Sequence, residues 1–335
     1  MTPNTPMIVR DAAWLADRYD PEHDAVHFRH VSREAHRAAT FLTDEYLPAA
    51  PPVVVGRGET MAASPPQAPL HFIFHSAFCC STLLARAVDV PRVAMGMKEP
   101  VVLNDLVGWK ARGASAADLT SVLNDALALL ARPFAPGEAV VVKPSNVVNG
   151  LASATLALRP TARALLLHAP LGTFLGSIAR KGMWGRLWVR DLLVKQIADG
   201  TQWPGMTMPE FLALTDLQAA AVGWLAQHAI FARMASRFPD RVRTTDSETL
   251  LADPATAMTA LGRLFGLDLD GPAIAAGPAF RAHAKFGGAF DTAARAAARA
   301  DEAAHADEID KVTRWAEVVA AGAGLGLRLP APLIG

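Results

Sequence analysis

Short, almost entirely apolar runs alternate with longer helical patterns through most of this chain, and this alternation constrains its fold more than any other feature. Strands are predicted at 71–74 (HFIF), in the stretch RVAMGM that ends at Met97, at 139–143 (AVVVK), at 162–168 (ARALLLH) and at 241–245 (RVRTT). Helices are predicted at 81–88, 115–132, 171–182 and 254–265, with one or two more at 210–237. Such alternation is typical of an α/β fold in which helices flank both faces of a mainly parallel sheet.

The alternation covers the middle of the chain and defines three parts. Residues 70–290 are predicted to form the α/β core. Residues 1–69 are predicted to be an N-terminal extension whose last part, 48–69, is rich in proline and small residues and is typical of a linker or surface loop. Short helices or strands are expected within 1–47, without fixed positions. Residues 291–335 are predicted to be an alanine-rich helical tail.

Charge and composition narrow the class of partner. Lys and Arg total 32, Asp and Glu total 32, and hydrophobic residues make up 51% of the chain, which is a globular composition. A net charge of zero without a basic run disfavours binding to nucleic acid. Any anion site must therefore be local.

The expected location is the cytoplasm. The N-terminal residues MTPNTPMIVRDAAW contain no apolar region of the kind found in a signal peptide. The longest stretch without a charged residue, 60–85, contains three prolines and does not resemble a membrane span. The two cysteines are adjacent, which excludes a disulfide framework and fits a reducing compartment.

The histidines and cysteines do not have the spacing of known metal-binding motifs, so no metal site is expected. The sequence does not indicate an oligomeric state.

Polar side chains follow four of the predicted strands. His75, Glu99 (after Lys98), Lys143 and His168 each come directly after an apolar run. Strand ends often reach solvent, so a single such residue has an ordinary explanation. The carboxyl ends of parallel strands, however, form the ligand crevice of an open α/β sheet. Four polar endings therefore predict a shared anionic or acid–base site.

The segment between the first core strand and its helix has the order of a phosphate-binding loop. Ser81 and Thr82 open the predicted helix, and Phe78 is the one large residue in the loop before them. Backbone N–H groups at a helix start bind phosphate when small residues let the anion approach. The glycines and the lysine of the G-x-x-x-x-G-K-[ST] pattern are absent, and Cys79 and Cys80 stand where glycine is expected. The alternative is an ordinary turn in which Ser81 caps the helix and the cysteines are small buried residues.

Four segments together resemble a known family. HSAFCCSTLL, KEPVVLNDL, VVVKPSN and ALLLHAPLGTFLGSIARKG occur in the order found in P-loop sulfotransferases, in particular the bacterial sulfotransferase-like branch. The resemblance spans roughly residues 70–290 and lies in the order of the motifs more than in identity. It implies a P-loop-type, sulfotransferase-like α/β core. It also implies an enzyme that transfers a sulfuryl group from 3′-phosphoadenosine 5′-phosphosulfate (PAPS) to a hydroxyl or amine of a small acceptor, without a metal.

The resemblance assigns roles to individual residues. The 5′-phosphosulfate would be held by Phe78, Cys79, Cys80, Ser81 and Thr82. The 3′-phosphate would be held by His168, Ser177, Arg180 and Lys181, with support from Lys285 in AKFGG.

Two departures from the family bear on activity. Phe78 replaces the family's loop lysine, and His168 replaces its strand-end arginine. Positive charge near the leaving oxygen would then come from Lys143 or Lys98. Glu99 is the candidate base for the acceptor, and His75 is its competitor.

Two other functions are consistent with the same residues. One is a P-loop kinase that uses ATP and Mg²⁺, although a kinase needs the lysine that this loop lacks. The other is a catalytically degenerate nucleotide-binding or scaffold protein. The segment GMWGRLWVR (182–190) could flank an aromatic or anionic acceptor, or could be a helix start that packs its tryptophans.

Overall fold

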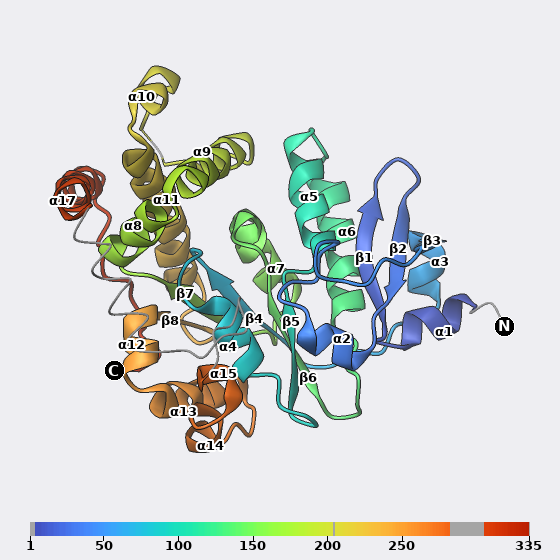
Figure 1. Cartoon of the computed structure of the whole chain (residues 1–335). Helices are drawn as coiled ribbons and strands as arrows, with labels where there is room; N and C mark the ends of the chain where they lie inside the picture. The colour runs from blue at the N-terminus through green and yellow to red at the C-terminus, as the bar shows by residue number, and fades with distance from the viewer. Residues whose placement is uncertain (1–3, 204, 282–304, 335) are drawn as a thin grey trace.

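The computed structural model describes residues 4–203, 205–281 and 305–334, whose strands form two sheets (Figure 1). The larger sheet has five parallel strands in the order β5-β6-β4-β7-β8. Its strands are β4 (Leu70–His75), β5 (Ala94–Lys98), β6 (Ala139–Lys143), β7 (Ala164–His168) and β8 (Val242–Asp246). The smaller sheet is antiparallel and consists of β1 (Trp14–Asp20), β2 (Ala25–His30) and β3 (Val53–Gly56).

Helices connect and cover these strands. In the N-terminal half they are α1 (Thr5–Arg10), α2 (Arg33–Ala38), α3 (Arg57–Ala62), α4 (Ser81–Ala87), α5 (Val101–Ala111), α6 (Ala116–Leu130), the 3-10 helix η1 (Asn146–Leu151) and α7 (Ala152–Leu158). In the C-terminal half they are α8 (Leu171–Arg180), α9 (Gly182–Ala198), α10 (Met208–Ala213), α11 (Asp216–Arg237), α12 (Ser247–Ala252), α13 (Pro254–Phe265), α14 (Gly271–Ala275), α15 (Pro278–Arg281) and α17 (Ala306–Gly322).

The parallel sheet separates two apolar clusters. Alternate residues of β4 belong to opposite sides, with Phe72 and Phe74 in the first cluster and Ile73 in the second. Strands buried on both faces need apolar residues at every position, which explains the uninterrupted apolar runs of the sequence. Gly96 of β5 permits close packing, because a Cβ there would lie 2.0 Å from the Ala85 carbonyl oxygen of α4. The predicted α/β fold with a parallel sheet flanked by helices is confirmed.

Local sequence signals account for several helix ends. Ser115 caps α6 by accepting a hydrogen bond from the Asp118 N–H, and Thr215 with Gln218 forms a capping box at α11. α13 ends at Gly266, whose φ of 69° suits glycine.

The N-terminal region contains more regular structure than its composition indicates. Residues 48–69 were expected to be a linker, and that expectation is wrong in part, because they contain β3 and α3. β3 pairs with β2, so a tertiary contact overrides the local signal of the prolines around it. Within 1–47 the structure has α1, β1, β2 and α2.

The later helices also differ from the expectation. The helix predicted at 171–182 ends at Arg180, and Gly182, with a φ of 56°, turns the chain into a second helix, α9. The segment GMWGRLWVR is the start of α9, as the second interpretation expected, but of its two tryptophans Trp188 is partly buried and Trp184 is exposed. α5 was not predicted. The alanine-rich tail is helical at 306–322, and the part of it before residue 305 lies outside the described residues.

The carboxyl ends of β4 and β6 form the switch point of the sheet. These strands are neighbours, but the chain after β4 enters α4, whose Leu84 lies in the second cluster. The chain after β6 enters η1 and α7, whose Leu156 lies in the first cluster. Connections that leave adjacent strands toward opposite faces open a crevice between them, where ligands bind in this class of fold.

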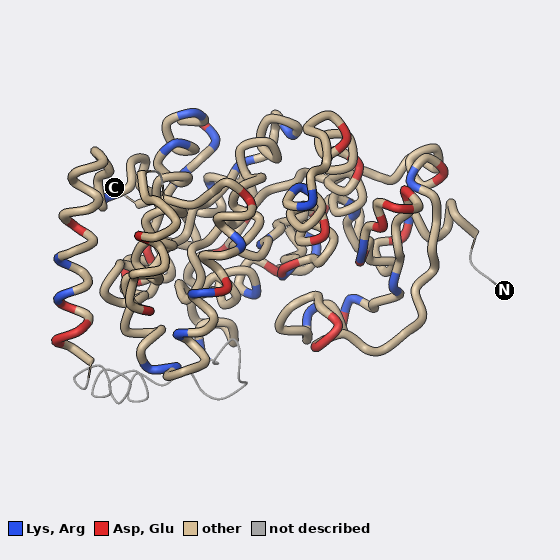
Figure 2. The backbone as a smooth tube through the Cα atoms, turned by 90° about the horizontal axis from the view of Figure 1, so that it is seen from above, with Lys and Arg blue, Asp and Glu red and all other residues tan. Residues whose placement is uncertain are grey.

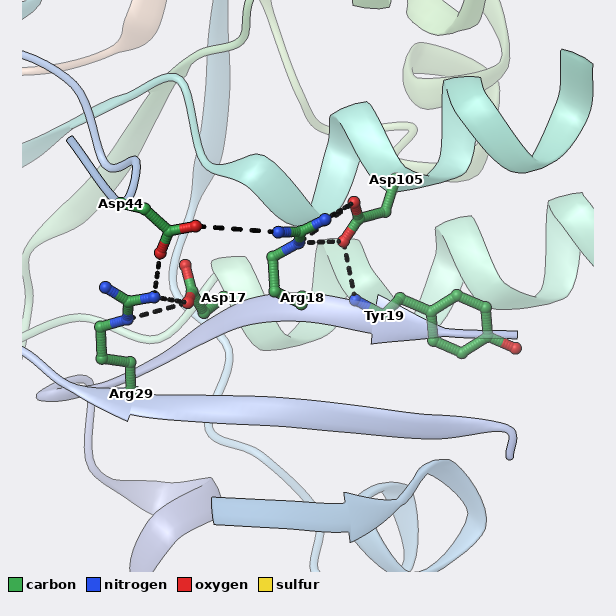
Figure 3. A network of polar contacts seen from close by, with 6 residues as sticks. All are labelled: Asp17, Arg18, Tyr19, Arg29, Asp44 and Asp105. Carbon is green, nitrogen blue, oxygen red and sulfur yellow. Dashed lines mark hydrogen bonds and ion pairs between the residues drawn. The ribbon is translucent and has the colours of Figure 1, made fainter. Parts of the chain in front are cut away.

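Ion pairs tie the smaller sheet to α5 and to the segment after α2. Arg18 of β1 donates to Asp105 of α5 through its Nε (2.9 Å) and Nη2 (2.8 Å), and the Tyr19 N–H donates to the same carboxylate (Figure 3). Arg29 of β2 pairs with Asp17 and with Asp44. Elsewhere Lys and Arg are interspersed with Asp and Glu along the chain (Figure 2).

Candidate active site

The loop between β4 and α4 turns without glycine. Ala77, Phe78 and Cys80 have φ values of 70°, 50° and 63°, a conformation that residues with a Cβ rarely adopt. Backbone strain of this kind persists where the surrounding structure enforces it, and it clusters at functional sites. The loop is therefore a candidate site on backbone geometry as well as on position.

Hydrogen bonds attach this loop to β7 and η1. The Ser76 N–H donates to the Leu167 carbonyl oxygen (3.1 Å), and the Cys79 thiol donates to the same oxygen. The Asn149 side-chain amide donates to the His75 carbonyl oxygen (3.0 Å). The loop is thus held from the strand on one side and from the helix after β6 on the other.

His75 is fixed by a hydrogen bond at each ring nitrogen. Its Nδ1 accepts from the Ala77 N–H at 3.0 Å, and its Nε2 lies 3.0 Å from the Pro144 carbonyl oxygen. A carbonyl oxygen can only accept, so Nε2 carries the proton and the imidazole is neutral in this arrangement. The side chain is buried.

Glu99 joins His75 and Lys143 in one cluster. Its Oε1 lies 3.8 Å from His75 Nε2 and accepts a hydrogen bond from the Lys143 ammonium. Glu99 also has a positive φ, 56°, and its N–H donates to the Lys143 carbonyl oxygen at 2.7 Å. The structure therefore brings together the three residues predicted for catalysis.

The Lys143 ammonium is enclosed on its other side by Phe41. The Nζ atom lies 4.9 Å from the centre of the Phe41 ring, and Lys143 is completely buried. A buried ammonium needs a counter-charge and a polarisable neighbour, which Glu99 and the ring provide.

Lys98, the second lysine predicted to supply charge, is used in another way. Its Nζ donates to the Arg37 carbonyl oxygen of α2 at 2.9 Å. Burial, together with the nearby Arg86 charge, lowers the pKa of Lys98 to about 8. Lys98 therefore ties α2 to β5.

His168 lies at the end of β7 in a separate cavity of about 660 Å³. Trp224, Thr245, Asp246, Glu317 and Arg328 are among the other residues that line it. The His168 ring packs edge-on against His228, with 5.2 Å between ring centres. Burial lowers the pKa of His168 below its ordinary value, against the opposing effect of Asp246, so the imidazole is largely neutral at pH 7.

The other residues predicted for the 3′-phosphate lie on or just after α8. The Ser177 hydroxyl donates to the Thr173 carbonyl oxygen (2.9 Å), and Arg180 donates to the Ser177 hydroxyl (3.2 Å). Lys181 is directed toward the β4–α4 loop, with its Nζ 5.7 Å from the centre of the Phe78 ring. Lys285 lies outside the described residues.

The loop residues themselves differ in exposure. Ser81 and Thr82 are buried, as is Cys79, whereas Phe78 and Cys80 are partly exposed. Burial raises the pKa of the Cys79 thiol to about 12, which leaves it protonated and a poor nucleophile.

Sequence reasoning missed Phe41, Asn149, Trp224 and Asp246. Phe41 belongs to the N-terminal region and reaches the site only through the packing of the smaller sheet. Asn149, which donates to the His75 carbonyl oxygen, lies in the 3-10 helix η1, and no periodic pattern in the sequence predicts that helix. Asp246 could have been found, since it follows β8 as the other polar residues follow their strands.

Within residues 4–203, 205–281 and 305–334, no three His, Cys, Asp or Glu side chains gather as ligands for a metal ion. Over those ranges no helix combines the length and the apolar character that crossing a bilayer requires.

The chain has matches among solved structures but not among family models or curated proteins. Among solved structures, the chain is similar to a sulfotransferase domain from the curacin biosynthetic pathway, with 13% identity, a TM-score of 0.43, and coverage of 67% of this chain and 81% of that one. It is also similar to the sulfotransferase domain of the Synechococcus PCC 7002 olefin synthase, with 14% identity, a TM-score of 0.40, and coverage of 61% and 76%.

Proposed function

We propose that this protein is a sulfotransferase that transfers a sulfuryl group from PAPS to a hydroxyl or amine of a small acceptor in the cytoplasm. The observation that carries the proposal is the cluster of His75, Glu99 and Lys143 beside a strained loop at the switch point of the sheet. A carboxylate and an ammonium in contact provide a base and a positive charge at one place. Neither nucleic acid nor membrane is proposed as a partner.

In the proposed reaction Glu99 accepts the proton of the acceptor. The acceptor oxygen or nitrogen then bonds to the sulfur of PAPS, and the bond from sulfur to the bridging oxygen breaks. Its electron pair stays on that oxygen, and adenosine 3′,5′-bisphosphate leaves. Lys143 stabilises the charge that develops during transfer. His75, locked between the Ala77 N–H and the Pro144 carbonyl oxygen, positions Glu99 and the loop.

Two separate places suit the two anionic ends of PAPS. The β4–α4 loop, with the buried Ser81 and Thr82 hydroxyls, suits the 5′-phosphosulfate. The cavity at the ends of β7 and β8 has room for the adenosine part, and Trp224 lines it as an aromatic wall. The Arg180 guanidinium, which lies beside the Ser177 hydroxyl on α8, has further N–H groups that would donate to the 3′-phosphate. ATP carries its charge in one continuous polyphosphate, so an ATP-binding protein does not need two separate anion sites.

Calorimetry with adenosine 3′,5′-bisphosphate, AMP and ATP tests the proposal. The bisphosphate should bind without metal and roughly ten- to a hundredfold tighter than AMP, because a second charged phosphate contact contributes about 1.5–3 kcal/mol. Ser81→Ala and Thr82→Ala should each weaken bisphosphate binding about tenfold or more for the same reason. Tight ATP binding that requires Mg²⁺ would support a kinase instead. The scaffold alternative is favoured if none of the three nucleotides binds.

A further inference from the structure

We infer that a monovalent cation of the size of potassium or ammonium binds in a small cavity where η1 and the end of α9 meet α11. The cavity has a volume of about 10 Å³, which is close to the room that one water-sized particle needs. Among the residues that line it are Asn149 and Gly150 of η1, Gln196 of α9, Asp199 directly after α9, and Gln227 of α11. The inference goes beyond the proposed function, because the proposed reaction uses none of these residues.

Three side-chain oxygens of the lining residues have no hydrogen-bond donor. They are Asn149 Oδ1, Gln196 Oε1 and Asp199 Oδ2, and none of them accepts a hydrogen bond from the part of the chain that the structure describes. The three residues are more than nine-tenths buried, with 2%, 6% and 7% of their surface exposed. Leaving a buried acceptor without a partner is costly, so a group of three indicates that something else contacts them.

The hydrogen bonds of the two amides fix which atom faces the cavity. Asn149 Nδ2 donates to the His75 carbonyl oxygen (3.0 Å) and to Gln227 Oε1 (2.9 Å). Gln196 Nε2 donates to the Gly223 carbonyl oxygen at 3.1 Å. Exchanging nitrogen and oxygen in either amide would place an oxygen against these acceptors. The atoms left without a partner are therefore oxygens.

Three oxygens suit a cation better than a water molecule. A water molecule has two hydrogens to donate and would leave one of the three oxygens without a partner, whereas a cation can contact all of them. Carboxylate and amide oxygens are also the ligands that hard cations prefer.

The surrounding charges favour a single positive charge. Lys110 donates to Asp199 Oδ1 at 2.8 Å, so the carboxylate is already shared with one ammonium and suits a monovalent ion. Burial nevertheless raises the pKa of Asp199 above its usual value, which shows that Lys110 does not compensate the buried carboxylate fully. The cavity also lies at the carboxyl end of the 17-residue helix α9, which is the negative end of the helix dipole. Lys195, which lines the cavity too, is exposed, so solvent screens its charge.

Asn149 connects this site to the β4–α4 loop. A cation at its Oδ1 would hold the side chain in the orientation in which Nδ2 donates to the His75 carbonyl oxygen, at the start of the loop. An ion can enter through a wider cavity of about 280 Å³, which shares Asn149, Gly150 and Thr201 with the small one and is also lined by the exposed Arg233.

Melting temperatures in different chloride salts test the inference. Potassium or ammonium chloride at saturation should raise the melting temperature by about 2 °C over choline chloride of equal ionic strength, because an ion that binds only the folded protein stabilises it. Choline has the same charge but is too large for the cavity. A shift with potassium alone assigns the site to an alkali ion, a shift with ammonium alone assigns it to an amine, and either supports the inference.

Three variants locate the ion. Gly150→Ala should abolish the shift, because a Cβ there would lie 2.1 Å from Asp199 Oδ2 and take the place of the ion. Asp199→Asn keeps the shape of the side chain without its charge and should reduce the shift to less than half. Asp191→Asn is the matched control: it removes the same charge from an exposed position on α9 outside the cavity, and it should keep the full shift.

The shift is measured within each variant, so a general loss of stability does not imitate the expected result, and circular dichroism checks that each variant folds. Equal melting temperatures of the wild type in all three salts contradict the inference. An equal shift in the wild type and in Asp199→Asn also contradicts it, because the ion would then bind elsewhere. Neither result bears on the proposed function, which nucleotide binding tests separately.

Discussion

Glu99 has a backbone conformation that few glutamates adopt. Its φ is 56°, and it precedes Pro100, whose ring disfavours the helical conformation at the preceding residue. A left-handed residue costs roughly 1–2 kcal/mol outside glycine. Here the conformation turns the carboxylate back toward Lys143 and His75. Strain at a residue that also contacts two titratable groups supports a chemical role.

The first prediction concerns this carboxylate. Glu99→Gln keeps the shape of the side chain but cannot accept the acceptor's proton. Turnover with PAPS and an accepted hydroxyl compound should fall by roughly 10²–10⁴, as for removal of a general base. The affinity for adenosine 3′,5′-bisphosphate should change little. Initial rates measured with sulfur-labelled PAPS check the first value, and calorimetry checks the second. A Glu99→Gln protein with wild-type turnover would transfer the role of base to His75.

The residues of the site divide into those that the sequence could predict and those that it could not. Because the sheet is parallel, His75, Glu99 and Lys143 had to end at one edge, and the structure brings them into contact. The sequence carries no comparable rule for Lys181, because its direction depends on the positive φ of Gly182 and on the docking of Phe78. His168 follows the strand-end rule but lies in the cavity beside Trp224.

At the scale of elements, the segment after α2 packs against the cluster of His75, Glu99 and Lys143. Phe41 covers Lys143, Tyr46 packs on Phe41 with ring centres 5.5 Å apart, and the Leu42 N–H donates to the Lys98 carbonyl oxygen. Asp44 anchors the same segment to the smaller sheet through Arg29 and, at 3.9 Å, through Arg18 (Figure 3). A sheet outside the predicted core thus positions a residue of the site.

The second prediction releases this segment. Asp44→Asn removes the carboxylate that pairs with the two arginines. We expect acylation of Lys143 by acetic anhydride to rise about fivefold, since the pairing of an exposed carboxylate contributes up to about 1 kcal/mol. Peptide mass spectrometry measures the labelling. The melting temperature should change little, because Asp44 is exposed.

Asp105→Asn is the control for this prediction. Asp105 belongs to the same network but contacts Arg18 and the Tyr19 N–H of β1. Its loss leaves Asp44 with both arginines, so Lys143 should stay protected. Equal protection in Asp44→Asn and in the wild type would show that Leu42 and Leu47, which are buried, hold the segment without the ion pairs.

The parts of the fold that the sequence did not predict depend on distant contacts. β3 is a four-residue strand between proline-rich stretches, and only its pairing with β2 defines it. The strands of the larger sheet were predictable because burial on both faces leaves a purely apolar signal. The strands of the smaller sheet do not alternate clearly between buried and exposed residues, as the mixed burial of β2 shows.

At the scale of the whole molecule, one apolar cluster joins the two sheets. Phe28 of β2 and Val55 of β3 belong to the same cluster as Phe72 of β4 and Val140 of β6. Residues before 70 therefore share a core with the parallel sheet, and the stability of the site depends on both sheets.

Several neutral histidines are buried in this molecule. His36 is the most enclosed of them, and neither of its ring nitrogens has a hydrogen-bond partner among the described residues.

The third prediction follows from the titration of His36. Burial, together with the charges of Lys98 and Arg33, lowers the pKa of His36 to about 3. Below pH 6.5 the unfolded chain binds a proton at this position that the folded protein does not, so the free energy of unfolding falls as the pH falls. The loss from His36 should reach about 2 kcal/mol between pH 7 and pH 5, at about 1.4 kcal/mol per unit of pKa difference. Urea denaturation of the wild type and of His36→Leu at both pH values measures this loss. The free energy of unfolding of the variant should fall by about 2 kcal/mol less than that of the wild type.

His23→Leu is the control for this prediction. Asp20 raises the pKa of the exposed His23, so replacing His23 cannot reduce the free energy of unfolding that is lost in acid. If His36→Leu and the wild type lose the same free energy, His36 is protonated in the folded protein and the enclosure inferred for it is wrong.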